Sequence, residues 1–203
     1  MKIQNKRLLA IYKELFKKHN YQGWWPIKGK YHPQDYSYPK NKNEIFEIII
    51  GAILTQNTNW KNTEKALQNL REENIISPEK IIKISHEELS ELIKSSGYFN
   101  QKTKKLKAFA EFYIKSEGKI PTREELLKVW GIGKETADSI LLYAYKQPYF
   151  VIDAYTKKLM KKYFNIENDY DKLQEFFHNN LLRDYKLFNE FHALIVAEGK
   201  NLR

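Results

Sequence analysis

Apolar side chains recur every three to four positions along almost the whole chain, and this periodicity constrains the fold more than any other feature. In segment 2–18, one broad face carries Leu8, Leu9, Ile11, Tyr12, Leu15 and Phe16. Strand signals are scarce, and neither an Asn-Gly nor an Asp-Gly hairpin signature occurs. A series of roughly ten helices with short connections predicts an all-α protein.

The individual helices differ in how they are expected to be buried. Segment 44–54 is apolar on nearly all sides, which is typical of a helix at the centre of a bundle. Further helices are predicted to follow Ser77-Pro78 and the capping boxes at 85–88 and 122–125, and to cover 62–73, 101–116, 154–164, 170–182 and 187–198. Segment 21–43 contains three prolines and predicts a long irregular connection, a type of loop that is often functional.

The charge balance indicates the chemistry of the partner. The chain has 35 Lys and Arg against 25 Asp and Glu, a formal net charge of +10 at pH 7. Such an excess predicts an anionic partner, and nucleic acid is the leading candidate. No apolar run reaches the roughly 18 residues that a membrane span requires. The first residues also lack the apolar stretch of a secretory signal, so we expect a cytoplasmic protein.

The residue types that are missing exclude several kinds of chemistry. The chain contains no cysteine, which excludes disulfides, a thiol nucleophile, Cys-ligated zinc and a Cys-held iron–sulfur cluster. No His-Glu-x-x-His or other metal-ligand spacing occurs. We therefore expect no catalytic metal and no cofactor.

The most informative stretch is 126–140, which predicts a helix, a tight Gly131-Ile132-Gly133 turn and a second helix. Glycines allow close approach of a ligand to the backbone, and the free N–H groups that begin a helix suit a phosphate. Such a grip holds a DNA backbone without reading its sequence. An ordinary helix–helix turn with a glycine cap is the alternative, but the following Thr136-Ala137 makes the pattern more specific.

With three further motifs, at 51–58, 96–102 and 151–156, the sequence resembles the helix-hairpin-helix DNA glycosylases of the endonuclease III superfamily. It is most similar to the 3-methyladenine DNA glycosylase-like members that lack an iron–sulfur cluster. The resemblance covers about residues 24–200 and implies two helical domains flanking a cleft. It implies a six-helix barrel at 41–148, with the hairpin at 126–145, and a second domain built from 1–40 and 149–203. Many relatives carry the cluster directly after the segment matched by Gly199-Lys200, so here packing alone is expected to fix the C-terminal helix.

The resemblance assigns catalysis to Asp153. A carboxylate near C1′ can stabilise the positive charge that builds on the sugar as a base departs, and can orient the attacking water. An N-cap role for Asp153 is compatible with this. Glu135 occupies the position of the Schiff-base lysine in bifunctional members, and a glutamate cannot form that imine. Lys134 lies one residue earlier, about 100° away around the helix, so it is expected to contact phosphate or solvent.

The same resemblance predicts a base pocket formed by Trp24, Trp25, Pro26, Phe46 and Glu135. Electron-rich indole rings stack well on alkylated purines, which can be cationic. Core packing is the alternative for at least one tryptophan. One departure is that Leu194 follows Phe191-His192-Ala193 where the subgroup has a lysine, and His192 itself is expected in the core.

The predicted DNA contacts come from the hairpin and from one loop. The hairpin supplies Gly131, Gly133, Lys134 and Thr136. Gln56 lies in the loop from which family members insert a residue into the gap left by the extruded base. A helix-capping or solvent-facing role is the alternative for Gln56.

The function expected from these residues is that of a monofunctional DNA glycosylase in base excision repair, without AP lyase activity. It would flip an alkylated purine out of double-stranded DNA and hydrolyse its N-glycosidic bond. A mismatch- or oxidised-base glycosylase on the same scaffold is one alternative. A non-catalytic helix-hairpin-helix DNA-binding protein is another. We expect a monomer that is cytoplasmic and associated with the nucleoid.

Overall fold

The computed structural model describes residues 5–166 and 169–201, so residues 2–4 of the first predicted helix lie outside the described residues. Within these ranges the regular secondary structure is helical, apart from one isolated antiparallel bridge between Ile27 and Lys30. The helices are α1 (Lys6–His19), α2 (Lys42–Leu54), α3 (Trp60–Glu72), α4 (Pro78–Lys83), α5 (His86–Leu92), α6 (Phe99–Lys115), α7 (Arg123–Lys128), α8 (Lys134–Ser139), α9 (Ala154–Phe164), α10 (Tyr170–Asn180) and α11 (Tyr185–Asn201). The all-α prediction is confirmed.

Two short turns add to these helices. A 3-10 turn spans Lys94–Ser96, and a π-helical turn, Ile140–Ala144, continues α8. Sequence periodicity does not distinguish such turns from ordinary helix, because they change the hydrogen-bond spacing and not the residue types. None of the described helices has both the length and the apolar character needed to cross a membrane.

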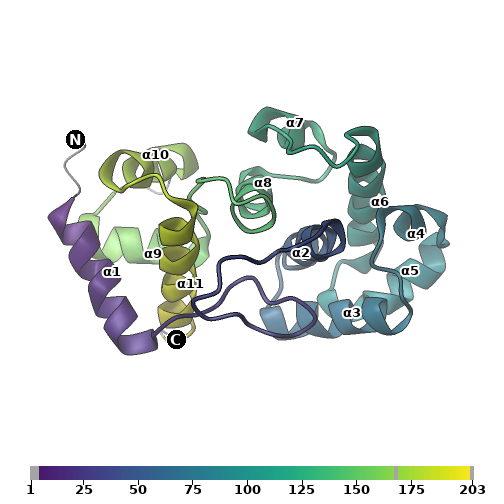
Figure 1. Ribbon diagram of the computed structural model, residues 1–203, viewed down its shortest axis with the longest axis horizontal. Helices are drawn as coiled ribbons and strands as arrows, with labels where there is room; N and C mark the ends of the chain where they lie inside the picture. Colours follow the sequence, from purple (N-terminus) through teal and green to yellow (C-terminus); the bar gives the residue numbers. More distant parts are fainter. Residues whose placement is uncertain (1–4, 167–168, 202–203) are drawn as a thin grey trace.

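The helices form two groups at opposite ends of the molecule (Figure 1). Helices α1, α9, α10 and α11 lie at one end, where α11 packs against α1 and α9. Helices α3 to α6 lie at the other end, with α2 and the hairpin of α7 and α8 on the side of that group that faces the first. The first and last helices therefore lie together, which confirms a two-domain helical fold. The boundaries at 40 and 148 stay a prediction.

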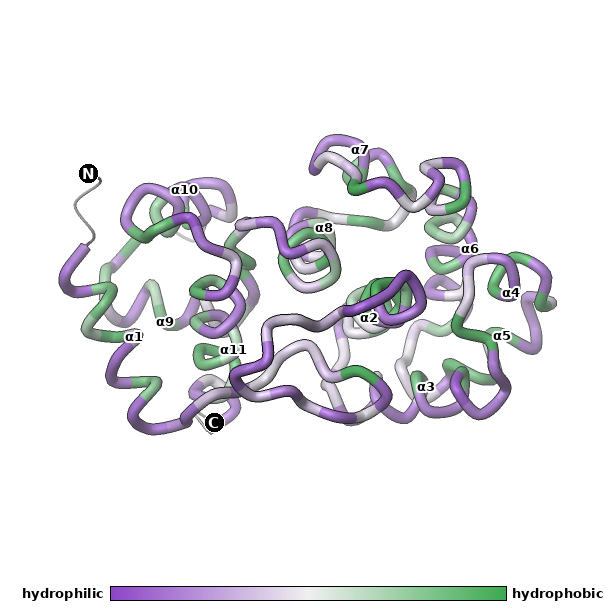
Figure 2. Tube along the Cα trace, in the orientation of Figure 1, coloured by the Kyte–Doolittle hydropathy of each residue, from purple (hydrophilic) through white to green (hydrophobic). Residues whose placement is uncertain are grey.

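Helix α2 lies at the centre of the fold. It contacts α3, α6, α8 and the turn 140–144, and the nine residues from Phe46 to Leu54 are all buried. Its hydrophobic turns stand out in Figure 2. Burial of these side chains away from water is the main force that holds the second group of helices together. The expected central, all-round apolar helix is thus present.

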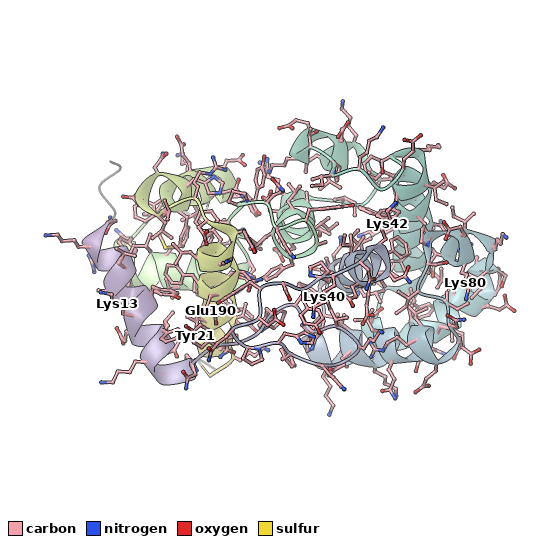
Figure 3. All side chains as sticks on the ribbon, viewed as in Figure 1. Lys13, Tyr21, Lys40, Lys42, Lys80 and Glu190 are labelled. Atoms are coloured by element: carbon pink, nitrogen blue, oxygen red, sulfur yellow. The ribbon has the colours of Figure 1, made fainter. Side chains whose placement is uncertain are left out.

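The long segment between α1 and α2 is fixed to the C-terminal helix. Glu190 of α11 accepts hydrogen bonds from the backbone N–H of Gln22 at 2.8 Å and from the Tyr36 hydroxyl at 2.7 Å. Asn189 donates its amide to the Trp24 carbonyl at 2.9 Å. Figure 3 labels Glu190 on α11, beside the segment that leaves α1. These bonds hold the predicted Trp24-Trp25 pair in place although it lies in irregular chain.

The end of α11 is held by more than packing, which corrects the expectation from the sequence. Glu198 accepts hydrogen bonds from Lys18 Nζ and His19 Nε2, each at 2.7 Å. The hydrogen bonds from Lys18 and His19 lower the pKa of the Glu198 carboxyl. Charged groups separated by about 180 positions in the chain therefore join α1 to α11.

A buried carboxylate joins the hairpin to α10. Asp138 of α8 is fully buried and pairs with both Arg123 Nε (2.7 Å) and Arg123 Nη2 (3.0 Å). It also accepts hydrogen bonds from the Tyr170 hydroxyl and the Gln174 amide, each at 2.7 Å. Gln174 donates to the Phe150 carbonyl as well, at 2.8 Å. The network therefore fixes the chain that leads into α9 relative to the hairpin.

A buried lysine fixes the C-terminal end of α2. Lys102, in the first turn of α6, donates to the carbonyls of Leu54 (2.8 Å) and Ser96 (2.7 Å). Burial, with a smaller contribution from nearby Lys105, lowers the pKa of Lys102 to about 8. A single side chain thus satisfies two carbonyls that would otherwise be left without partners at the ends of helical turns.

Candidate active site

A cavity of about 600 Å³ lies where the two groups of helices meet. Its walls come from the Trp24-Trp25 segment, the end of α2, the loop 55–59, the start of α3, α8, the start of α9 and α11. Of the predicted site residues it contains Trp24, Trp25, Gln56, Glu135, Thr136 and Asp153. Residues from distant parts of the chain therefore converge on one concave surface, as expected of a ligand site.

Asp153 is positioned by the helix that it begins. Its carboxylate accepts a hydrogen bond from the Thr156 N–H at 2.7 Å, which makes it the N-cap of α9. The side chain is 15% exposed and lines the cavity. The N-cap therefore fixes the backbone and one carboxylate oxygen, while the carboxyl group stays at the cavity wall.

His192 lies beside this carboxylate. Its Nε2 is 3.6 Å from Asp153 Oδ2, and its Nδ1 is 2.6 Å from the hydroxyl of the buried Tyr143. Burial by itself would raise the pKa of Asp153, but interactions with His192 and with the Thr156 N–H outweigh it and hold this pKa below its ordinary value. Asp153 is therefore kept as a carboxylate.

Glu135 is the second carboxyl group of the cavity. It stands in the first turn of α8, where its side chain lines the cavity and remains open to solvent on one side. Partial burial, together with the negative charge of Asp153, raises the pKa of Glu135, although His192 and Lys157 oppose this rise. The pKa values of the two carboxyls are thus pushed in opposite directions, an arrangement that can assign them different roles in proton transfer.

Aromatic rings form one wall of the cavity. Trp60, the first residue of α3, lies 5.4 Å from Trp24 and 5.2 Å from Trp25 between ring centroids. Tyr143 lies behind Trp25 at 5.1 Å. Trp25 also packs closely on Gly51, because a Cβ at that position would come within 3.0 Å of the indole Nε1. The wall offers extended π surface against which a planar base can stack.

Two members of the predicted base pocket are not in the cavity. Phe46 is 2% exposed and packs in the core, with its ring centroid 5.2 Å from that of Tyr113. It precedes the cavity residue Ala52 by six positions, which is about 9 Å along the helix axis and about 120° away around it. Pro26 is buried and does not line the cavity either. The structure therefore corrects the pocket at both positions.

Three of the cavity residues that were not predicted as site residues bear directly on its chemistry. Trp60 lies two residues after the 51–58 motif, and this position is the only signal that could have indicated it. His192 is buried, as its apolar helix predicts, and it also lines the cavity, 3.6 Å from Asp153. Lys200 lines the cavity with its Nζ 5.6 Å from the centroid of Trp24, and burial lowers its pKa.

The hairpin has the predicted geometry. Gly131 has a φ of +81°, and Gly133 precedes α8 without any side-chain cap among the described residues. Lys134 points away from the cavity and forms an exposed ion pair with Asp171 of α10. This position agrees with the expectation that the Lys134 side chain does not reach the pocket.

Gln56 and Thr136 are bound to each other. The Gln56 amide donates to the Thr136 hydroxyl at 2.9 Å and to the Gly131 carbonyl at 3.2 Å. Its oxygen accepts a hydrogen bond from Lys105 Nζ at 2.5 Å. Thr136 is buried, so its hydroxyl serves the loop 55–58 within the protein. A DNA contact by Gln56 stays a prediction.

One other large hollow, of about 630 Å³, lies among the ends of α3, α4 and α5. It contains none of the predicted site residues, and its charged groups are mostly exposed lysines and glutamates. The cavity that holds Asp153 is therefore the better candidate for chemistry. No group of three His, Asp or Glu side chains in the described ranges is arranged to hold a metal ion.

A two-domain helical fold, a glycine hairpin and an aspartate at an aromatic cavity are together the features expected of the helix-hairpin-helix DNA glycosylases. A family model described as HhH-GPD superfamily base excision DNA repair protein matches residues 50–182. The chain belongs to this family, and among its members to the DNA glycosylases.

Individual relatives agree with this assignment. A Methanocaldococcus jannaschii protein named as a DNA repair glycosylase is 39% identical over 206 residues, covering 95% of this chain and 87% of its own. Endonuclease III of Thermotoga maritima is 33% identical over 129 residues, 62% of this chain and 60% of its own. The structure of the H. pylori 3-methyladenine DNA glycosylase bound to 1,N6-ethenoadenine superimposes with a TM-score of 0.81, at 30% identity over 97% of this chain and 98% of that one.

Proposed function

We propose that this protein is a monofunctional DNA glycosylase that hydrolyses the N-glycosidic bond of an alkylated purine, using Asp153. The observation that carries the proposal is the ionised Asp153 carboxylate at the wall of a cavity lined by three tryptophans. The duplex would lie across the cavity mouth, with the hairpin glycines on its backbone. The damaged base would turn out of the stack into the cavity.

The proposed chemistry requires one carboxylate that stays charged. As the bond between C1′ and the base nitrogen breaks, its electron pair leaves with the base and positive charge builds on the sugar. Asp153 stabilises that charge, because its low pKa keeps it ionised at neutral pH. Water then bonds to C1′, and the proton that it loses is accepted by the carboxylate.

The aromatic wall of the cavity favours an electron-poor planar base as the substrate. Trp24, Trp25 and Trp60 line the cavity, and the electron-rich face of an indole ring attracts alkylated, cationic purines. The H. pylori relative, which is named for 3-methyladenine and was solved with an ethenoadenine, offers a precedent for modified adenines as ligands of this fold. We therefore place alkylated purines ahead of oxidised or mismatched bases as substrates.

We propose that no lyase step occurs, because residue 135 is a glutamate. A carboxyl group there cannot form an imine with the abasic sugar, and Lys134 is paired with Asp171 outside the cavity. Lys61 and Lys200 do line the cavity. Borohydride trapping therefore tests the proposal, because an enzyme–DNA adduct that is lost on replacing Lys134, Lys61 or Lys200 would show a lyase mechanism.

A panel of lesion-containing duplexes tests substrate and mechanism together. Base release and strand nicking are scored separately on duplexes with alkylated purines, oxidised bases or mismatches. We expect release of alkylated purines without nicking. Release of only oxidised or mismatched bases would reject the substrate, and nicking would reject the monofunctional mechanism. DNA binding without any release would indicate a non-catalytic binding protein.

A further inference from the structure

Two elements with predicted DNA contacts, the loop after α2 and the hairpin, meet helix α6 at one side chain. Gln56 follows α2, Gly131 and Thr136 belong to the hairpin, and Lys105 comes from the middle of α6. The side-chain amide of Gln56 donates hydrogen bonds to two acceptors on the hairpin, the Gly131 carbonyl and the Thr136 hydroxyl. Its oxygen accepts a hydrogen bond from Lys105 Nζ. The loop, the hairpin and α6 are therefore joined through one amide.

The chemistry of lysine fixes which way this amide faces. An ammonium group can only donate, so it selects the Gln56 oxygen, and the nitrogen must then face the two acceptors on the hairpin. The reverse orientation would place an amide N–H against the Lys105 ammonium and an oxygen against the Gly131 carbonyl. Lys105 therefore determines the orientation of the amide as well as its position.

The stem of Lys105 is built into the hairpin. A Cβ on Gly131 would lie 2.5 Å from Cγ of Lys105, so the methylene chain crosses the bare face of this glycine, whose φ is +81°. Lys105 is partly buried, whereas Lys104 beside it is exposed. The stem of Lys105 thus packs against the hairpin, and its ammonium group is hydrogen-bonded within the protein.

We propose that Lys105 is a positioning residue that acts through Gln56, holding its amide and the loop 55–58 in register with the hairpin, and that it is not a phosphate contact. The proposal rests on the proposed function in one respect, because it takes this loop and the hairpin to bind the same duplex. Lys105 makes the two binding elements one rigid unit before DNA arrives, which reduces the entropy cost of ordering them on binding.

A double-mutant cycle tests whether Lys105 acts through Gln56. Lys105→Met keeps an apolar stem over Gly131 but removes the hydrogen-bond donor to Gln56. Lys105→Arg keeps a donor at this position. Lys104→Met removes a neighbouring positive charge and serves as the control. In single-turnover base release we expect Lys105→Met to lose about tenfold, the equivalent of one hydrogen bond to a charged group. We expect Lys105→Arg to restore most of this loss, and Lys104→Met to stay within about twofold of the parent. Adding Lys105→Met to Gln56→Ala is expected to cost nothing more.

The dependence of DNA affinity on salt separates positioning from phosphate binding. A lost phosphate contact lowers the slope of log affinity against log salt by about 0.9. We expect the slope for Lys105→Met to equal that of the parent. A reduced slope with effects additive to those of Gln56→Ala, or an equal loss in Lys104→Met, would overturn the proposal and make Lys105 a phosphate contact.

A measurement on the free protein keeps this test independent of glycosylase activity. In NMR spectra without DNA, the side-chain NH2 protons of Gln56 are expected to exchange slowly in the parent and faster in Lys105→Met, with slow exchange regained in Lys105→Arg. Unchanged exchange in Lys105→Met would reject the positioning role. Absence of base release by the parent would reject only the proposed function.

Discussion

Asp153 Oδ2 lies 3.6 Å from His192 Nε2, and the other nitrogen of that ring meets the Tyr143 hydroxyl at 2.6 Å. The carboxylate from the start of α9 and the imidazole from α11 thus form one chain of polar groups ending in a buried phenol. His192, together with the Thr156 N–H, holds the pKa of Asp153 below its ordinary value although burial raises it.

Removing His192 should therefore shift the pH dependence of base release. His192→Ala takes away the group that lowers the pKa of Asp153, so this pKa rises and the acidic limb of the single-turnover rate profile moves to higher pH. Tyr143→Phe keeps the imidazole and serves as the control, with a smaller shift. An acidic limb at the same pH in His192→Ala and the parent would contradict this role.

The capping role of Asp153 can be separated from its catalytic role by stability. Asparagine also caps helices well, so Asp153→Asn should unfold within about 0.5 kcal/mol of the parent, whereas Asp153→Ala should lose about 1 kcal/mol. The folded pKa of Asp153 is below 3.8, so its carboxylate stabilises the fold above that pH. The difference between parent and Asp153→Ala should shrink as pH falls through the folded pKa. Urea unfolding at several pH values measures this, and an equal loss in both variants would exclude a specific cap.

Placing a lysine at 135 should introduce lyase chemistry. Position 135 lines the cavity with Asp153, so the amine of Glu135→Lys would face the sugar and can form an imine at C1′. We expect a borohydride-trapped adduct and strand nicking with Glu135→Lys, and neither with the parent or Glu135→Gln. Trapping of the parent to the same extent would refute the assigned role of the side chain at 135.

Buried Lys102 should produce an alkaline increase in stability. Its folded pKa of about 8 lies below the unfolded value of 10.5, so the unfolded chain binds more protons between these values and the free energy of unfolding rises with pH there. Lys102→Met should remove this slope. It should also destabilise the protein by about 2 kcal/mol at neutral pH, because the carbonyls of Leu54 and Ser96 lose their donor. Parallel unfolding curves for parent and variant from pH 8 to 10.5 would contradict the assignment.

The two ion pairs of Arg123 and Lys119 should differ strongly in their effect on stability. Arg123→Met leaves the fully buried Asp138 carboxylate without its cation and should cost about 3 kcal/mol or more. Lys119→Met removes an ion pair to Glu117 in which both side chains are at least 75% exposed, and should change stability by less than about 0.5 kcal/mol. Equal effects in thermal or urea unfolding would show that the Asp138 network does not hold the hairpin to α10.

The sequence predicted the helices well because their signals are local. Periodic apolar positions and the Ser85 and Thr122 capping boxes depend on residues within three or four positions of one another, and both boxes are present. The hairpin at Gly131 was likewise visible from residue types alone. Asp153 was found through its motif, and its position at the cavity wall agrees with that assignment.

The sequence did not reveal which side chains face the cavity, since that depends on packing between distant helices. Phe46 and Ala52 lie on one helix, and only their rotation relative to Asp153 decides that Ala52 reaches the cavity. The apolar helix of His192 correctly predicted its burial, but not its position beside Asp153. The hydrogen bond from Lys105 to Gln56 joins residues 49 positions apart, and no local pattern marks it.

We propose that Asp153 performs the chemistry, and one comparison of variants tests this role most directly. Parent and Asp153→Asn are measured for single-turnover release of an alkylated purine from duplex DNA and for affinity to the same duplex. We predict that Asp153→Asn loses at least about a thousandfold in release rate, the magnitude of a lost transition-state charge contact, with nearly unchanged affinity. Equal release rates for the variant and the parent would contradict the account.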